Sequence, residues 1–487
     1  MRSCSAAILL VLAATCSGIA VERREEERAA DEAPRVLGFD LERNEIQDPV
    51  LHDRQRLRKR ETLDLTVENE QTLYLLNASI GTPPQPVRLH VDTGSSDLWV
   101  NTADSRFCSS RQDPCSFTGT YSANDSSSYR YLNSAFNITY ADGSGAQGDY
   151  VADTLRLPGA AVDGFQFGVG YVSSADQNIL GIGYASNEVQ AGQDGLREYN
   201  NLPIALVSQG AVGANLYSLW LDDLDSGTGR LLFGGVDTSR FRGDLVTVPV
   251  QPTGRSSYTA FYVTLTALAL GNRRLGGDMA LAVLLDSGTS LTYLPDDIAS
   301  DIFDQANVTF DDSSGIGLVD CAANASDASL IFNFSSPAAI SVPMSELVLA
   351  VGNTTSTPGS DGSDSSAPSC LFGIAPSGGS TVVLGDTFLR SAYVVYDLDN
   401  NQVSMAQSDV NATGPGDVVE VRNATALPSA VRAPDPVPAR SGLPSQRGGG
   451  GGGGGSRKSA AVPAAAAASA SLGGIIAVVA LTGAYLV

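Results

Sequence analysis

Histidine is nearly absent from this chain of 487 residues, since only His52 and His90 occur. A zinc site built from several histidines is therefore excluded, and a Ser-His-Asp triad in the folded part can be built only around His90. His90 lies in an alternating run, so Leu89 and Val91 are expected on one side of a strand and His90 on the other, as a hydrogen-bonded histidine. No Gly-Lys-Ser/Thr phosphate loop occurs either, so we predict neither a metal nor a cofactor.

Lysine is equally scarce. Only Lys59 and Lys458 are present, and 53 acidic residues face 30 basic ones, which gives a formal net charge of −23. The acidic balance therefore argues against binding of nucleic acid or of an anionic membrane through a basic face. Two interpretations of the acidic balance stay open: a secreted protein adapted to acid, in which few basic groups limit positive self-repulsion, or drift in composition.

Long apolar runs are missing from most of the chain. The N-terminus has a short one from Ala6 to Ala14, preceded by Arg2 and followed by Gly18 and Ala20, which predicts a cleaved signal peptide over residues 1–20. Asn-x-Ser/Thr sequons agree with secretion. The candidate N-glycosylation sites are Asn77, Asn124, Asn137, Asn307, Asn324, Asn333, Asn353, Asn411 and Asn423.

Cysteine is sparse once the signal peptide is removed. Four residues remain, and in an oxidising compartment four cysteines suggest two disulfides with three possible pairings. Proximity favours Cys108–Cys115 and Cys321–Cys370, so a thiol nucleophile is not expected.

Residues 21–60 are dense in charge and have few aromatic residues, which favours a pro-segment over a core element. The segment ends at the dibasic pair Lys59-Arg60, where we expect a kexin-like processing protease to cut after Arg60. The alternative is a charged tail that is not cut.

From residue 61 to about residue 408 the sequence consists of short β-branched and aromatic runs separated by Gly, Asn, Asp and Ser. This pattern predicts a mainly β fold. The best candidate for a helix is "PDDIASDIFDQAN", residues 295–307, where Ile298, Ile302 and Phe303 recur at helical spacing.

The C-terminal part changes composition again. Residues 409–459 are rich in Pro, Ala and Gly and include eight consecutive glycines, which predicts a flexible linker. Residues 460–487 end in the apolar stretch "LGGIIAVVALTGAYLV", preceded by small residues and a short spacer. This order favours a glycolipid (GPI) attachment signal removed on maturation, with attachment between Gly450 and Ser459. A plain tail-anchored helix is the alternative.

Two similar turns carry the candidate chemistry. "DTGSSDLWV" begins at Asp92, and "DSGTS" begins at Asp286, 194 positions later and again after an apolar run. Each turn has a later companion, since "NILGIG" contains Gly181 and "VVLGDTF" contains Gly385. The repetition indicates that a whole lobe of the chain is duplicated.

The order "DTGSSDLWV", "YADGS", "NILGIG", "DSGTS", "VVLGDTFLRSAYVVYD" closely resembles the pepsin-like (A1-type) aspartic proteases, over roughly residues 70 to 408. Secreted and anchored fungal members, the candidapepsins and yapsins, are most similar. The resemblance implies a bilobal acid-protease fold with two duplicated β lobes, 61–248 and 249–408, and an active-site cleft between them. In one departure, the first cysteine loop holds only six residues, whereas some yapsins carry a long insertion there.

The resemblance makes Asp92 and Asp286 the catalytic pair. Amide hydrolysis needs one ionised and one neutral carboxyl group, and two neighbouring carboxylates that share a proton provide both. Glycine at positions 94 and 288 lets each turn aim N–H groups at its carboxylate. By resemblance, Thr93 and Ser287 brace the loops across the lobe boundary, and Ser95 and Thr289 hydrogen-bond the outer carboxylate oxygens.

Residues 138–151, "ITYADGSGAQGDYV", predict a glycine-rich hairpin. By resemblance, Tyr140 is the tyrosine of a flap that closes over substrate, with Trp99 as its partner and Gly143 near the tip. The alternative for Tyr140 is a packed side chain in a surface hairpin. Asp142 is a candidate for attracting a basic substrate side chain, and otherwise a solvated turn residue.

These patterns predict an acid-active aspartic endopeptidase made as a zymogen, acting on proteins or peptides as a monomer. It would be secreted and held by its glycolipid anchor at the outer plasma membrane or cell wall. Two alternatives belong to other classes: a catalytically inactive pepsin-like binding protein, and a structural cell-wall glycoprotein suggested by the sequons and the glycine tail. The second leaves the duplicated turns unexplained.

Overall fold

The computed structural model describes residues 35–46, 71–140, 144–311, 315–350, 369–410, 412, 414, 416–422 and 427–444. Several predicted features lie outside these residues. They are the signal peptide, the dibasic pair Lys59-Arg60, the flap residues Asp142 and Gly143, the glycine run, the anchor signal, and the sequons at Asn353, Asn411 and Asn423.

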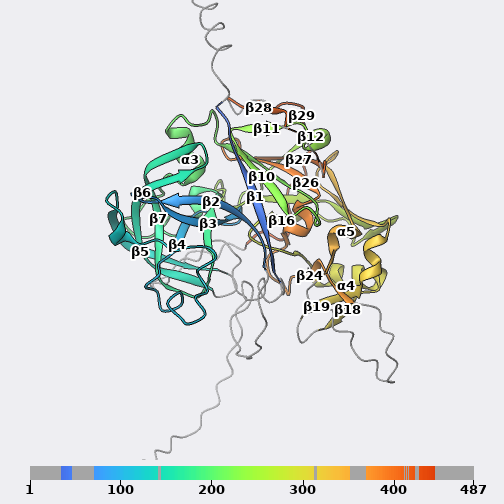
Figure 1. The fold of residues 1–487 in the computed structure, drawn as a ribbon. Coiled ribbons are helices and arrows are strands. Elements are labelled where there is room, and N and C mark those ends of the chain that lie inside the picture. Colours follow the sequence, from blue (N-terminus) through green and yellow to red (C-terminus); the bar gives the residue numbers. More distant parts are fainter. Residues whose placement is uncertain are drawn as a thin grey trace, which may run out of the picture.

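The fold is mainly β, as predicted. Fourteen strands form one large sheet in the order β29-β12-β27-β26-β9-β10-β1-β2-β3-β8-β4-β7-β6-β5. Its N-terminal part lies on one side of the molecule (Figure 1). That part contains β2 (Gln71–Ile80), β3 (Gln85–Asp92), β4 (Leu98–Asn101), β5 (Arg130–Thr139), β6 (Gly145–Leu157), β7 (Ala160–Ser173) and β8 (Asn178–Gly181).

The central part of this sheet connects the two halves of the chain (Figure 1). Its strands are β1 (Leu37–Ile46), β9 (Leu216–Leu221), β10 (Thr228–Phe233), β12 (Phe241–Pro249), β26 (Ala392–Asp397), β27 (Gln402–Ser408) and β29 (Ala430–Arg432). A two-stranded sheet, β11 (Gly235–Asp237) with β28 (Val418–Glu420), lies beside it.

The C-terminal half forms three smaller sheets on the other side of Figure 1. The first contains β13 (Tyr262–Leu265), β16 (Leu281–Leu285), β25 (Val383–Leu384), β17 (Thr292–Leu294) and β24 (Ile374–Pro376). The second contains β15 (Arg273–Leu275), β14 (Ala267–Leu270), β20 (Ser329–Asn333) and β21 (Ala339–Pro343). The third contains β18 (Thr309–Asp311), β19 (Ile316–Asp320), β23 (Ser369–Phe372) and β22 (Val348–Leu349).

Helices are short in the described part of the chain. They are α3 (Leu202–Ser208), α4 (Asp296–Ala306), α5 (Met344–Leu347) and α6 (Asp386–Leu389), with 3₁₀ turns at Ala123–Asp125, Ala185–Asn187 and Cys321–Ala325. The predicted helix is confirmed as α4, which buries Ile298, Ile302 and Phe303 and is followed by Asn307 in the left-handed conformation. No helix among the described residues is long and apolar enough to cross a bilayer.

The duplication is visible in the strand pairing. In the N-terminal half, β3 runs parallel to β8, and β4 pairs antiparallel with the same strand. In the C-terminal half, β16 runs parallel to β25, and β17 pairs antiparallel with it. The Asp92 turn lies between β3 and β4, and the Asp286 turn lies between β16 and β17. The two turns therefore occupy equivalent places in the two lobes.

One part of the predicted pro-segment belongs to the core. β1 pairs with β10 on one side and β2 on the other, and it buries Phe39 and Leu41 against the main apolar cluster. The expectation that residues 21–60 contribute no core element is therefore wrong for Leu37–Ile46. Leu37, Phe39 and Leu41 alternate with Gly38, Asp40 and Glu42, which is the period of a half-buried strand, and the high charge of the segment conceals it.

The predicted flexible linker also begins later than composition indicates. Residues 416–422 and 427–444 lie along the fold, where β28 pairs with β11 and β29 runs parallel to β12. Further along, the backbone N–H of Arg440 donates to the Ala280 carbonyl, and the N–H of Ala282 donates to the Ser441 carbonyl. The linker expectation is therefore wrong for these residues, which we call the C-terminal strap.

Candidate active site

Asp92 is the last residue of β3 and lies inside the fold. Val87, Leu89 and Val91 alternate along this strand and enter the apolar core, which fixes the strand and its end. β3 pairs with β2 on one side and with β8 on the other, so that Asp92 lies opposite Gly181 of β8. The carboxyl-bearing residue is 1% exposed.

Asp286 follows β16 in the same way. All five residues of β16 are buried, because the strand lies between β13 and β25. The backbone N–H of Asp286 donates to the carbonyl of Leu384 at 3.2 Å, and the residue is 7% exposed. Each aspartate thus lies at the end of a buried strand, and packing in the core of its lobe fixes the position of that strand.

The two turns hold their carboxylates with matching hydrogen bonds. Asp92 accepts from the Gly94 N–H at 2.8 Å and from the Ser95 hydroxyl at 2.5 Å. Asp286 accepts from the Gly288 N–H at 2.8 Å and from the Thr289 hydroxyl at 2.8 Å. Such donors orient a carboxylate and favour its ionised form.

Gly94 brings the two carboxyl groups together. Its N–H holds Asp92, and a Cβ built on the same residue would lie 2.6 Å from Oδ1 of Asp286. Both carboxyl groups therefore contact one glycine. Any side chain at position 94 would collide with Asp286, so glycine is required here for the close approach as well as for the turn.

Thr93 and Ser287 join the two turns across the lobe boundary. The Thr93 N–H donates to the Ser287 hydroxyl at 3.2 Å, and the Ser287 N–H donates to the Thr93 hydroxyl at 3.0 Å. The hydroxyls in turn donate to carbonyls of the opposite lobe, Thr93 to Leu285 at 3.0 Å and Ser287 to Val91 at 2.9 Å. These bonds fix the two aspartates relative to each other.

Gly181 and Gly385 are needed because the turns pass directly over them. A Cβ on Gly181 would lie 2.5 Å from the backbone nitrogen of Ser96. A Cβ on Gly385 would collide with the carbonyl oxygens of Thr289 and Leu291. The repeated glycines seen in the sequence are therefore contact points between each turn and the strand beside it.

The predicted hairpin is present as β5 and β6, with Thr139 opposite Gly145. Tyr140 is buried at its end, and its hydroxyl accepts a hydrogen bond of 2.6 Å from the indole nitrogen of Trp99. The N–H of Tyr140 donates to the carbonyl of Ser144 at 2.9 Å, which joins the two arms of the hairpin beyond the last pair of the ladder. Tyr140 and Trp99 thus form one hydrogen-bonded pair.

Sequence reasoning missed a buried acidic cluster beneath this pair. Asp97, which precedes β4, accepts hydrogen bonds from Tyr150 at 2.6 Å, Tyr199 at 3.0 Å and the Val189 N–H at 2.8 Å. Burial raises the pKa of the Asp97 carboxyl above its usual value, although these donors oppose the shift. Asp97 stands inside the turn motif, but its partners lie far along the chain and give no local signal.

Glu188 extends this acidic cluster. It is 3% exposed, and its carboxylate accepts from the Tyr199 N–H at 2.8 Å. Burial, reinforced by repulsion from the neighbouring Asp97 carboxyl, raises the pKa of Glu188 to about 10. An edge-to-face contact between Tyr150 and Phe136, with ring centroids 5.3 Å apart, connects this cluster to the flap hairpin.

His90 is buried and hydrogen-bonded, as expected for a strand histidine. It lies on the opposite side of β3 from Leu89 and Val91, and it is 1% exposed. Its Nε2 atom lies 3.3 Å from the carbonyl oxygen of Ser287. The contact therefore crosses the lobe boundary, which the sequence pattern did not indicate.

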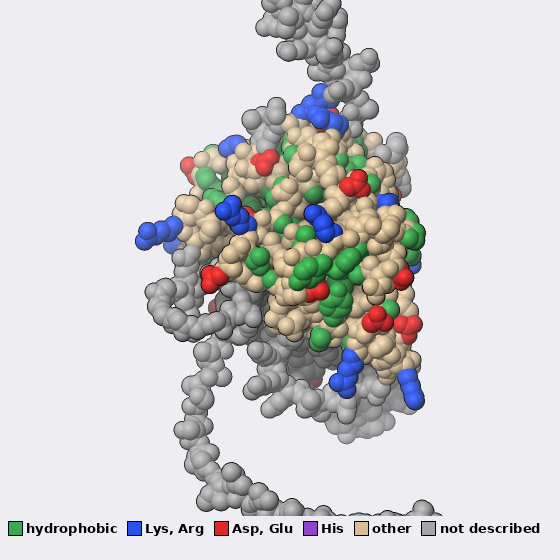
Figure 2. Space-filling model, turned by 90° about the vertical axis from the view of Figure 1, so that its left-hand side faces the viewer, with side chains coloured by type: hydrophobic (Ala, Val, Ile, Leu, Met, Phe, Trp, Pro, Cys, Tyr) green, Lys and Arg blue, Asp and Glu red, His purple; other side chains and the backbone are tan. Residues whose placement is uncertain are grey.

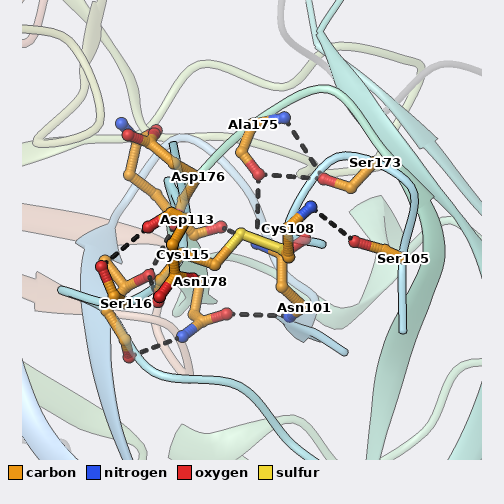
Figure 3. Close-up of a disulfide and its surroundings, with 12 residues drawn as sticks. Asn101, Ser105, Cys108, Asp113, Cys115, Ser116, Ser173, Ala175, Asp176 and Asn178 are labelled. Carbon is orange, nitrogen blue, oxygen red and sulfur yellow. Dashed lines mark hydrogen bonds between the residues drawn. A yellow bond between two sulfur atoms is a disulfide. The ribbon is translucent and has the colours of Figure 1, made fainter. Parts of the chain in front are cut away.

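Two disulfides are present, with the pairing that proximity favours. Cys108–Cys115 closes the short loop after β4, and Cys321–Cys370 connects a 3₁₀ turn to β23. The first disulfide lies beside Asn101 and Asn178 (Figure 3). The Asn178 side chain accepts from the Asn101 N–H at 2.8 Å, which joins the end of β4, ahead of the cysteine loop, to β8, the strand that pairs with β3.

The surface view in Figure 2 shows acidic and basic side chains scattered singly over the face it presents, with apolar side chains gathered between them. That face has no continuous basic patch. Within the described ranges, no three His, Cys, Asp or Glu side chains form a group that could hold a metal ion. Of the predicted sequons, Asn77, Asn124, Asn307 and Asn324 are exposed, and Asn137 and Asn333 are partly exposed.

Comparison with known proteins gives consistent matches. Residues 73–408 match the family model described as eukaryotic aspartyl protease. A probable aspartic-type endopeptidase opsB of Aspergillus oryzae is 47% identical over 411 residues, which cover 83% of this chain and 82% of that protein. A protein of the same description from Arthroderma benhamiae is 45% identical over 433 residues, 84% and 85% of the two chains. Secreted aspartic protease 1 of Candida albicans is 38% identical over 389 residues, 78% of this chain and 92% of that protein.

Proposed function

The chain belongs to the eukaryotic aspartyl protease family and is an aspartic endopeptidase, and from that membership we propose that Asp92 and Asp286 together activate the water that attacks the peptide bond. One observation supports this above the others: both carboxyl groups contact Gly94, and matching hydrogen bonds hold each of them. The proposal assigns the two aspartates one shared catalytic role.

The proposed chemistry follows from the closeness of the two groups. Like charges this close resist joint ionisation, so one carboxyl stays protonated while the other is ionised. The ionised carboxylate takes a proton from the water as it attacks the substrate carbonyl, and the neutral carboxyl protonates the carbonyl oxygen. A proton then passes to the leaving nitrogen. Because the pair must hold one proton, activity should be highest at acid pH and fall as that proton is lost.

Tyr140 is proposed to close over the bound substrate, with Trp99 holding its hydroxyl. Thr93 and Ser287 are proposed to keep the two carboxylates in register, and Ser95 and Thr289 to orient their outer oxygens. Asp142 and Gly143 remain proposed contributors at the flap tip, and a preference for basic substrate side chains would follow from the Asp142 charge.

The test is cleavage of a denatured protein at pH 4 by the secreted chain, with and without pepstatin, beside an Asp92→Asn variant. We expect pepstatin to inhibit the wild type and the variant to be inactive. Cleavage that survives the substitution would contradict the assignment. A wild-type chain that binds pepstatin but cleaves nothing between pH 3 and 8 would instead favour the inactive binding protein.

We also propose secretion as a zymogen that a kexin-like protease cuts after Arg60. The pairing of β1 with β2 and β10 supports this, because a cut at Arg60 would separate β1 from β2 in the chain while their hydrogen bonds remain. A chain with Lys59→Ala and Arg60→Ala should be secreted uncut and with little activity. Full activity of the uncut chain would contradict the zymogen proposal.

The last part of the proposal is anchoring through a glycolipid at the outer plasma membrane or cell wall. There the enzyme would act as a monomer on protein or peptide substrates. It rests on the small residues, spacer and apolar tail at the C-terminus. Phosphatidylinositol-specific phospholipase C should release the enzyme from intact cells. Retention on the cells after treatment, together with release by detergent alone, would indicate a tail-anchored helix instead.

A further inference from the structure

His90 is the histidine that the proposed mechanism leaves without a role, and it lies next to the catalytic turns. It stands two residues before Asp92 on β3, so the two side chains leave the strand on the same side. Its Nε2 atom reaches the Ser287 carbonyl oxygen at 3.3 Å, across 197 positions of sequence. A carbonyl oxygen only accepts hydrogen bonds, so Nε2 carries the proton, in the neutral ring or in the charged one.

The Ser287 carbonyl belongs to the same peptide group as the Gly288 N–H. That N–H donates to Oδ1 of Asp286 at 2.8 Å. His90, the Ser287–Gly288 peptide and Asp286 therefore form one chain of hydrogen bonds. A donor at the oxygen of a peptide polarises the group and strengthens the bond that its N–H makes.

The other lobe lacks a counterpart. The residue two positions before Asp286 is Leu284, whose side chain has no hydrogen-bond donor. The remaining bonds of the two turns match each other closely, from Gly94 and Gly288 to the exchange between Thr93 and Ser287. His90 is therefore a difference between two otherwise similar halves of the site.

We propose that His90 is a positioning residue for the reaction: its Nε2–H fixes and polarises the Ser287–Gly288 peptide, which holds Asp286 and favours ionisation of Asp286 over Asp92. This inference rests on the proposed catalytic pair. It assigns the asymmetry of the pair to a single side chain from the opposite lobe.

The other titratable side chains near the pair do not supply this asymmetry at acid pH. Tyr217 on β9 interacts with the charge of Asp92, and Tyr262 on β13 and Tyr396 on β26 interact with that of Asp286. Burial raises the pKa of all three tyrosines, so they remain neutral in the acid range. Asp386 on α6 is also buried near the Asp286 turn, and it interacts with Tyr396 and with the Arg390 guanidinium.

The test compares three variants of the full secreted chain. His90→Leu removes the donor. His90→Gln keeps a side-chain N–H at a similar reach. Leu75→Val, directly opposite His90 on β2, loosens the same part of the sheet while leaving the donor in place. For each variant, kcat and KM are measured from pH 2 to pH 7, together with the melting temperature and the fraction of enzyme that binds pepstatin.

We expect His90→Leu to lower kcat about tenfold, which corresponds to about 1.4 kcal/mol, with KM little changed. The acid limb of its pH profile should move to higher pH, because a weaker Gly288 donor favours ionised Asp286 less. His90→Gln should recover most of both effects. Leu75→Val should lower the melting temperature and leave kcat and the pH profile unchanged.

A His90→Leu enzyme with wild-type kcat and acid limb would overturn the inference, as would a His90→Gln enzyme no better than His90→Leu. If His90→Leu does not fold, His90→Gln carries the test: a folded His90→Gln enzyme that keeps the side-chain N–H but shows a tenfold lower kcat and a shifted acid limb would refute the role of this donor. An active Asp92→Asn control would refute the proposed pair itself. A wild-type-like His90→Leu beside an inactive Asp92→Asn would refute only the role of His90.

Discussion

Thr93 and Ser287 exchange hydrogen bonds across the boundary between the two lobes, each backbone N–H donating to the other hydroxyl, at 3.2 and 3.0 Å. Because each residue directly follows one of the two aspartates, this exchange sets the distance between the carboxyl groups. The geometry of the site therefore depends on the docking of the lobes as much as on either turn.

Thr93→Val tests this relationship, since valine keeps the shape and removes the hydroxyl. The buried Ser287 N–H and Leu285 carbonyl would both lose a partner. We expect the free energy of unfolding to fall by about 1–3 kcal/mol and kcat to fall with it. Chemical denaturation and steady-state kinetics measure the two effects, and Thr93→Ser, which retains the hydroxyl, is the control expected to resemble wild type.

Tyr140→Phe tests the flap. The change leaves the buried Trp99 indole N–H without the acceptor that it has at 2.6 Å. If the pair positions the flap over substrate, kcat/KM should fall about tenfold or more. Tyr131→Phe removes a hydroxyl from an exposed tyrosine on β5 of the same hairpin and should leave kcat/KM unchanged. Equal kinetics for both variants would argue against a role for Tyr140 in closure.

Glu188 should make the fold less stable as pH rises. Burial raises its pKa to about 10 in the folded state, so the folded protein binds a proton that the unfolded chain releases above its ordinary carboxyl pKa. The stabilisation is complete below pH about 4.5 and declines as pH rises from there toward 10. Asp97 contributes in the same direction.

Glu188→Gln should therefore flatten the fall in melting temperature between pH 5 and pH 8, because the amide does not ionise. Asp244→Asn changes an exposed carboxyl on β12 and serves as the control. Identical pH dependence of the melting temperature in wild type and Glu188→Gln would show that Glu188 does not carry this effect.

The C-terminal strap should stabilise the enzyme. A chain that ends at residue 410 lacks the strap, and a chain that ends at residue 446 keeps it, while both lack the glycine run and the predicted anchor signal. The shorter chain loses strands β28 and β29 and the backbone bonds to Ala280 and Ala282. We expect its melting temperature to be lower by about 5 °C or more. Equal melting temperatures would mean that the strap lies on the fold without stabilising it.

Much of this architecture can be predicted from the sequence because it repeats. The turns at Asp92 and Asp286, the companion glycines Gly181 and Gly385, and the helix over Asp296–Ala306 all have local patterns. β1 lies within the predicted pro-segment and the strap within the predicted linker, and no strand was expected in either, because composition averages over a segment and hides a short alternation. Phe39 and Leu41 carry that alternation in β1.

Contacts between residues far apart in the sequence are of another kind. His90 meets Ser287 across the lobe boundary, and Asp97 meets Tyr199 within the N-terminal lobe, only after distant segments come together. No local pattern around any of these residues identifies its partner, because the pairing is decided by the docking of the lobes and the packing of the hairpin. Such contacts are where the structure adds most to the sequence.

The central claim is that Asp92 and Asp286 act as one unit, and kinetics of Asp92→Asn, Asp286→Asn and the double variant at pH 4 test it most directly. We predict that each single variant loses as much kcat as the double variant, because neither carboxyl activates water without the other. A single variant that keeps a substantial part of the wild-type kcat, or losses that multiply in the double variant, would contradict the account.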